Sequence, residues 1–215
     1  RAFADYPASL LTVSINSFAL VWSLPVFLVG VGPQGASDAL AAFGVDELAV
    51  ISLTAVMVAG AMIAFLRALA VGDVSYVAPI SKIVPVFVVP IEVLALGQVL
   101  TPLEVAGVVV ATIAVYVANF RGGALLDPLR RATTSTAARL AILSAMAFAV
   151  SDVARRLALQ ELAIPVGLWI PLLLGGVAAV LLPAAILADT PATFRADLPK
   201  FAAGGLFVAV GEGLT

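Results

Sequence analysis

The chain has 215 residues, of which 63% are hydrophobic and 11% charged, and its formal net charge is −2. Soluble domains carry about 25% charged residues, so this composition excludes a soluble globular protein and a disordered chain and predicts an integral membrane protein. The slightly negative charge leaves no basic surface for nucleic acid. His and Cys are absent, so we expect no disulfide, no thiolate or imidazole metal site and no cofactor.

Seven apolar segments are long enough, or nearly long enough, to cross a bilayer, which takes about 20 residues in a helix. They are residues 8–31, 48–71, 74–96, 103–120, 138–158, 162–188 and 200–215. Continuous apolar runs are typical of membrane helices, whereas barrel strands alternate in polarity. The predicted fold is therefore an all-α membrane bundle. We predict loops for its two longer links, residues 32–46 and 121–137.

The first and sixth segments are weakly similar, because each contains two prolines 18 residues apart: Pro7 and Pro25, then Pro165 and Pro183. Aligning the two segments predicts a repeat of five helices. Five is odd, so consecutive copies run in opposite directions, as in many secondary transporters. The expected organisation is a first repeat without its opening helix (1–120), a linker (121–137) and a second repeat truncated after its third helix (138–215).

Three stretches of sequence carry a family resemblance. Residues 68–80 (ALAVGDVSYVAPI), 85–87 (PVF) and 96–107 (LGQVLTPLEVAG) resemble the EamA-like domain of the drug/metabolite transporter superfamily. The resemblance implies ten helices in two EamA repeats and transport, commonly export, of a metabolite, an amino acid or a drug-like amphiphile. Gln98 departs from the family, which often has Glu after this Leu-Gly pair.

Basic residues gather on one side of the predicted bundle, eight against two. The positive-inside rule then places residues 121–137 in the cytoplasm. With one helix missing before Arg1, the N-terminus would lie outside, whereas the resemblance implies a cytoplasmic N-terminus. The orientation stays open, and we expect a multi-pass protein of the cell (plasma or inner) membrane.

Lys82 is the deepest ionisable group, about 12 Å from the start of its segment. An ionisable residue at this depth indicates a functional site, here for an anionic or carboxylate-bearing substrate. The alternative is a structural ion pair with a neighbouring helix. Pro79, Pro85 and Pro90 lie in the same segment. Because each removes a main-chain donor, they predict a broken helix around Lys82.

Two carboxylates are further candidates for substrate binding or coupling. Glu212 lies twelve residues, about 18 Å, past Lys200. It could hold a coupling proton or pair with Lys82. Asp152 shares a helix face with Arg155 and Arg156, three and four residues on. An ion pair within that helix, at the membrane edge, therefore competes with a role in a site.

Two uncharged polar residues complete the candidate set. Asn16 lies in the middle of the first segment and could face a cavity, although such residues also hydrogen-bond neighbouring helices. Tyr76, near the start of the third segment, could line the site or anchor the helix at the membrane interface.

The function that fits these features is a secondary transporter working by alternating access. Its partners would be membrane lipid and a small-molecule substrate, and a homodimer is left open. There is no Walker-type phosphate loop, so the chain itself is not expected to hydrolyse ATP. One alternative is an intramembrane enzyme, but no residues stand at a recognisable catalytic spacing and no enzyme is expected. The other is a seven-helix receptor, suggested by the segment count alone.

Overall fold

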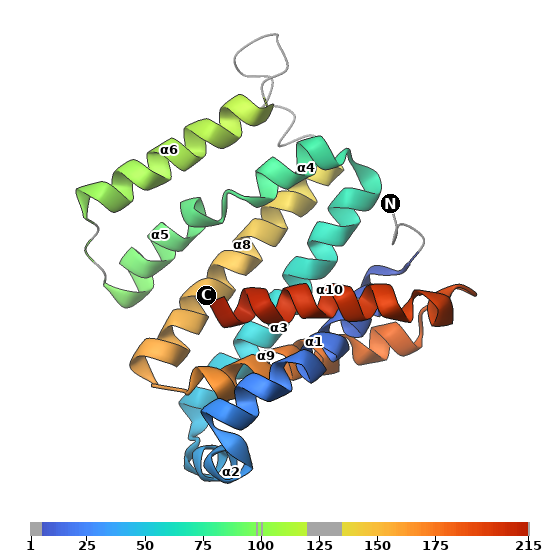
Figure 1. The fold of residues 1–215 in the computed structure, drawn as a ribbon. Helices are drawn as coiled ribbons and strands as arrows, with labels where there is room; N and C mark the ends of the chain where they lie inside the picture. The colour runs from blue at the N-terminus through green and yellow to red at the C-terminus, as the bar shows by residue number, and fades with distance from the viewer. Residues whose placement is uncertain (1–5, 98, 100, 120–134, 215) are drawn as a thin grey trace. The chain divides into compact units, whose positions relative to one another are not determined.

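The computed structural model describes residues 6–97, 99, 101–119 and 135–214, and the regular structure in these ranges is helical (Figure 1). The α-helices are α1 (Ala8–Gly30), α2 (Gly32–Ala42), α3 (Val45–Val71), α4 (Val74–Ser81), α5 (Val84–Leu96), α6 (Pro102–Asn119), α8 (Thr136–Arg156), α9 (Val166–Ile186) and α10 (Phe194–Leu214). A short π-helix (Leu157–Glu161) extends α8. The prediction of an all-α fold is confirmed for the described part of the chain.

Five helical stretches among the described residues have the length and apolar composition of a membrane span: Ala8–Gly30, Val45–Val71, Val74–Leu94, Thr136–Glu161 and Val166–Ile186. They correspond to five of the seven predicted segments. The apolar stretch of α6, Pro102–Ala114, is shorter, and the charged residues of α10 keep it outside this group. The chain is thus a helical membrane protein, and the count of seven spans stays a prediction.

Two boundaries differ from the prediction. The link 32–46 is not a loop throughout, because α2 occupies Gly32–Ala42. Pro33 stands in its first turn, where a missing N–H costs nothing, and alanines with high helix propensity follow. The last helix begins at Phe194, six residues before Lys200, so Glu212 lies 18 residues, about 27 Å, from its start.

The chain forms two compact units. The first unit contains residues 1–59 and 154–215, and the second unit contains residues 60–153. Each unit takes helices from both sides of the predicted linker, so the division into two repeats stays a prediction. Most of the linker 121–137, like Gln98, lies outside the described residues.

In the first unit, α1 packs against α9 and α10. The interior is filled by large apolar side chains of α9 and α10, among them Trp169, Ile170 and Phe201, each at most 1% exposed. The closest approach of α1 and α10 is at Gly205, where an added Cβ would lie 2.6 Å from the Cβ of Phe18 and 2.7 Å from the main-chain nitrogen of Ala19. The crossing therefore requires glycine at this position.

A polar cluster ties the start of α1 to the first turns of α10. The hydroxyl of Tyr6 donates to Oδ2 of Asp197 at 2.6 Å and lies 3.1 Å from Oγ1 of Thr193. Nζ of Lys200 donates to Oδ1 of the same carboxylate at 2.6 Å. The Tyr6 ring also packs edge-on against Phe201, with centroids 5.2 Å apart. Tyr6 and Asp197 are each 8% exposed, so hydrogen bonds satisfy a largely buried charge.

The second unit is built on a close contact between α3 and α8. Ala68 of α3 and Ala137, Ala138 and Ala141 of α8 are buried together with Val77 and Ile80 of α4. Small side chains allow the two backbones to approach closely. Oγ of Ser144 donates across the contact to the carbonyl of Ala61 at 2.9 Å, which is the interhelical role expected of a membrane serine.

Helix α6 begins with a reciprocal cap between Thr101 and Glu104. The main-chain N–H of Thr101 donates to Oε2 of Glu104 at 2.8 Å, and the N–H of Glu104 lies 3.3 Å from Oγ1 of Thr101. This capping box satisfies donors that the first turn leaves without helical partners. The preceding helix, α5, ends at Gly97 with φ +64°, a left-handed conformation that glycine adopts without strain.

The crossing of α1 and α10 makes a prediction about two adjacent glycines. Gly205→Ala should destabilise the protein by about 1–3 kcal/mol, because the new Cβ meets main-chain atoms that cannot move aside. Gly204→Ala is the matched control, since its Cβ would meet only the Ile15 side chain, at 3.6 Å. The control should be neutral or stabilising by up to about 1 kcal/mol. Thermal unfolding in detergent measures both, and equal melting temperatures would contradict the assignment of this crossing.

The polar cluster makes a prediction about pH. Hydrogen bonds from Lys200 and Tyr6 lower the pKa of Asp197 below its ordinary value of 3.8. The carboxylate precedes the predicted seventh segment and should stabilise the fold at neutral pH. A group with a lowered pKa loses its contribution as the pH falls through its folded value. The difference in melting temperature between wild type and Asp197→Asn should therefore be constant above pH 5 and shrink below pH 3.8. A difference in melting temperature that grows on acidification would contradict this prediction.

Candidate functional site

The third predicted segment is broken at Lys82 and Ile83, between α4 and α5. The last bonds of α4 are tightened, because the N–H groups of Lys82 and Ile83 donate to carbonyls three residues back, at 3.1 and 3.2 Å. Pro85 lies in the first turn of α5 and has no N–H. The carbonyl of Ser81 therefore lacks the donor that a continuous helix would supply four residues on. Pro79 lies inside α4 and Pro90 inside α5.

A cavity of about 650 Å³ opens beside this break in the second unit. Its walls come from four helices and from the break itself. They are Met62 and Phe65 of α3, Ala78 and Ser81 of α4, Lys82 of the break, then Val84, Pro85 and Val88 of α5, and Phe148 and Asp152 of α8. Its volume is within the usual range of small-molecule sites. Its walls are mostly apolar with few polar groups, as is also usual for such sites. The cavity is thus large enough for a solute of drug or metabolite size.

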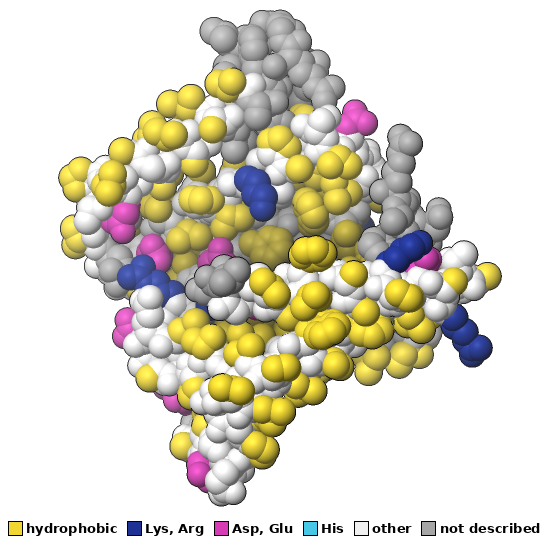
Figure 2. All heavy atoms as spheres, in the orientation of Figure 1, with side chains coloured by type: hydrophobic (Ala, Val, Ile, Leu, Met, Phe, Trp, Pro, Cys, Tyr) yellow, Lys and Arg dark blue, Asp and Glu magenta, His cyan; other side chains and the backbone are white. Residues whose placement is uncertain are grey.

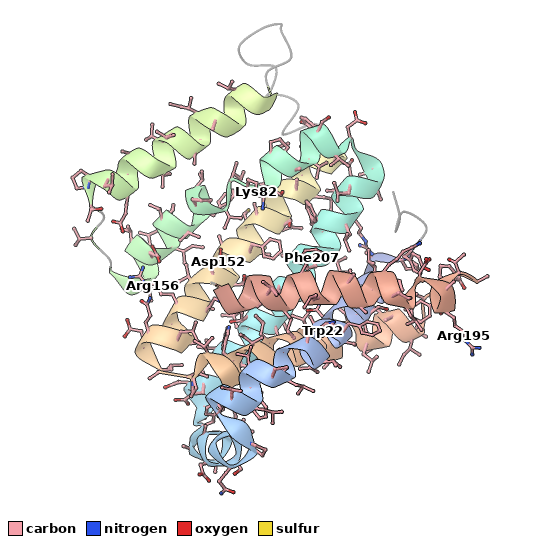
Figure 3. All side chains as sticks on the ribbon, in the orientation of Figure 1. Trp22, Lys82, Asp152, Arg156, Arg195 and Phe207 are labelled. Carbon is pink, nitrogen blue, oxygen red and sulfur yellow. The ribbon has the colours of Figure 1, made fainter. Side chains whose placement is uncertain are left out.

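Lys82 and Asp152 both line this cavity (Figure 3). Ser81 contributes less polarity, because its hydroxyl donates to the carbonyl of Ala78 in its own helix at 2.8 Å. Lys82 is exposed and forms no ion pair among the described residues. Figure 2 shows a dark blue side chain among hydrophobic ones at the place where Figure 3 labels Lys82. The cavity therefore offers one positive and one negative side chain on apolar walls.

Each of the two arginines after Asp152 has a partner further along the chain. Arg155 forms an ion pair with Glu212 of α10, and the two side chains are 20% and 27% exposed. Nε of Arg156 donates to Oε1 of Gln160 at 3.0 Å. Arg155 and Glu212 lie in the first unit and Lys82 in the second. The carboxylate of Glu212 thus has a guanidinium partner within its own unit.

The two uncharged candidates are held by their own surroundings. Asn16 is 7% exposed, and its Nδ2 donates to the carbonyl of Thr12, one turn back in α1, at 2.9 Å. Tyr76 packs beside the buried cluster of α3, α4 and α8. Neither residue is among those that line the 650 Å³ cavity. Of the five candidate side chains, the structure brings Lys82 and Asp152 to one cavity.

Several cavity residues were not predicted from sequence. Phe148 precedes Asp152 by four residues and so shares its helix face. That spacing is a signal by which it could have been found. Met62 and Phe65 come from α3, and they reach this cavity only because α3 packs against α8. No local pattern in the sequence reports that contact.

The helical spans, the broken helix and the cavity beside it define a helical membrane protein with a cavity at a helix break. The model of the EamA-like transporter family matches residues 2–120, more than half of the chain. The chain therefore belongs to the EamA-like transporter family, whose members are membrane transporters of the drug/metabolite type. No curated protein and no solved structure gives a significant match. The matched region includes the cavity walls from α3, α4 and α5, whereas Phe148 and Asp152 lie beyond it.

The ion pair in the first unit makes a prediction about stability. Arg155→Gln and Glu212→Gln should each destabilise the protein by about 1–3 kcal/mol, because each leaves one charge without its partner. We expect a smaller loss of stability than at a fully buried ion pair, because both side chains are partly exposed. The double variant should recover part of the loss.

Thermal unfolding of the wild type, both single variants and the double variant measures the coupling between the two side chains. Arg156→Gln is the matched control, because it removes the neighbouring arginine and leaves the pair intact. Strictly additive effects of the two single changes would show that the pair does not contribute.

Proposed function

We propose that the protein is a secondary transporter that exports a small solute through the cavity at the α4–α5 break. The observation that carries this proposal is the placement of Lys82 and Asp152 on one apolar cavity of about 650 Å³. Ionisable side chains in membrane segments are costly and usually face a bundle interior or an aqueous path. Here two of opposite sign, separated by 70 positions in the sequence, line the same space.

The chemistry of the walls suggests the kind of solute. Lys82 can pair with a carboxylate or another anionic group, and Asp152 can accept hydrogen bonds from an ammonium group. Phe65, Phe148 and Met62 provide soft, apolar surface for the remainder of the molecule. An amino acid or an amphiphilic metabolite with a charged end and an apolar body fits this combination.

The broken helix is the element that we expect to move during alternating access. Interrupted helices at the binding site are a recurring feature of secondary transporters. The tightened end of α4 and the proline in the first turn of α5 leave a two-residue joint between them, Lys82 and Ile83. A change at this joint would move Lys82 relative to the walls from α3 and α8. We propose that substrate binding and this movement are coupled.

Export across the plasma or inner membrane is the direction that the family resemblance implies. Two inverted five-helix repeats, of which the predicted second begins at residue 138, would surround the substrate path. The match of the family model to residues 2–120 supports the first of these repeats.

Substitution of the two charges tests the proposal. In vesicles loaded with a panel of radiolabelled amino acids, Lys82→Gln and Asp152→Asn should each raise KM at least about tenfold for the transported solute. A tenfold change corresponds to the loss of about 1.4 kcal/mol of binding. Arg67→Gln is the matched control, because this exposed arginine of α3 does not line the cavity. It should leave transport unchanged.

The same assay separates transport from chemistry. Solute should leave the vesicles unaltered, as chromatography of the released label will show. Release of a covalently changed product would overturn the proposal in favour of an intramembrane enzyme. Unchanged transport kinetics in both cavity variants would show that the substrate takes another path.

A further inference from the structure

The first unit contains a second cavity, of about 390 Å³, between α1, α9 and α10. Its walls are largely apolar and include Leu10, Val13 and Phe18 of α1, Leu182 and Ile186 of α9, and Leu198 of α10. It contains none of the residues that line the cavity at the α4–α5 break. Nothing in the proposed transport cycle uses it, so its occupant is a separate question.

The cavity runs from a polar connection into the apolar part of the unit. Thr190, in the connection between α9 and α10, lines one end. Along α1 the lining extends from Leu10 to Phe18, eight residues or about 12 Å. Half of a bilayer's hydrocarbon core is about 15 Å thick. The length of the cavity along α1 is therefore close to the depth of one lipid leaflet, and its polar end is at the α9–α10 connection.

We infer that this cavity binds one phospholipid of the surrounding membrane, with an acyl chain along α1 and the headgroup at the α9–α10 connection. The apolar walls alone give little preference for one lipid over another, because lipid chains are as apolar as the side chains that they meet. Selectivity must therefore come from the charged groups near the polar end, beside Thr190.

Two exposed residues of opposite charge flank that end. Asp189 directly precedes Thr190, and Arg195 directly follows Phe194, and both Thr190 and Phe194 line the cavity. Figure 3 shows Arg195 extending outward from the first turn of α10. Arg195 has no ion-pair partner among the described residues. The other cation of these turns, Lys200, already pairs with Asp197.

This arrangement selects a headgroup that carries both charges. Arg195 can hold the phosphate, for which guanidinium geometry is well suited. Asp189 can accept hydrogen bonds from a primary ammonium group. Phosphatidylethanolamine has both groups. Phosphatidylglycerol lacks the ammonium group, and the quaternary ammonium of phosphatidylcholine has no N–H to donate. Of these three lipids only phosphatidylethanolamine fits both side chains, and it is the inferred ligand.

Native mass spectrometry of the purified protein tests this inference. The protein is incubated in detergent with equimolar phosphatidylethanolamine, phosphatidylglycerol and phosphatidylcholine carrying the same acyl chains. The wild type should retain phosphatidylethanolamine about fivefold over the other two. Arg195→Gln and Asp189→Asn should each reduce that preference to near unity. Both substitutions are at exposed positions, so the test does not depend on a variant that disturbs the core.

A third variant tests the position of the acyl chain. Ser17 is exposed on α1 and lines the cavity, so Ser17→Phe should reduce retention of all three lipids by filling the space. Arg67→Gln is the matched control and should behave as wild type. Preference for phosphatidylglycerol, equal retention of the three lipids by the wild type, or unchanged retention in Ser17→Phe would overturn the inference. So would an equal loss of preference in Arg67→Gln.

Discussion

A polar main-chain group in the hydrocarbon core has to find its partner inside the protein, since no water is present to supply one. The stretch from α4 to α5 meets this constraint only in part. Pro85 cannot donate to the carbonyl of Ser81, and the end of α4 closes with shortened turns. Such backbone is tolerated at membrane depth where it lines a protein cavity. The proline that breaks the helix therefore lies where a cavity lets the interrupted backbone be tolerated.

Charged side chains also need partners inside the protein, and the charged residues of this chain differ in whether they have one. Arg155 and Glu212 compensate each other within the first unit, and Asp197 is compensated by Lys200 and Tyr6. A compensated pair can stabilise a fold without any ligand. Lys82 has no such partner among the described residues. A cation of this kind gains most from an anionic group that arrives with a substrate, so Lys82 is a better candidate for a substrate site than Glu212.

Much of this architecture was predictable from the sequence because membrane helices must be long and apolar, and length and polarity are local properties. Depth within a segment singled out Lys82, and proline content predicted the break. Helix α2 was missed because glycine and proline are common to loops and to helix starts. The partner of Arg155 was missed because Glu212 is 57 positions away. Pairing at that distance depends on how helices pack, which no local pattern encodes.

The packing of α1 against α9 bears on how the whole chain is organised. These are the two segments whose proline spacing suggests a repeat. Pro7 and Pro165 are the residues at their N-caps, and Pro25 and Pro183 lie inside them. The longer connection in the first copy contains α2, which has no counterpart between α9 and α10 among the described residues.

If α1 and α9 are equivalent, the copies pair helix by helix, and each compact unit necessarily draws on both sides of the linker. In that arrangement neither half of the chain could bury its own apolar faces alone. The linker at 121–137 would then join two halves of one bundle and not two separate domains.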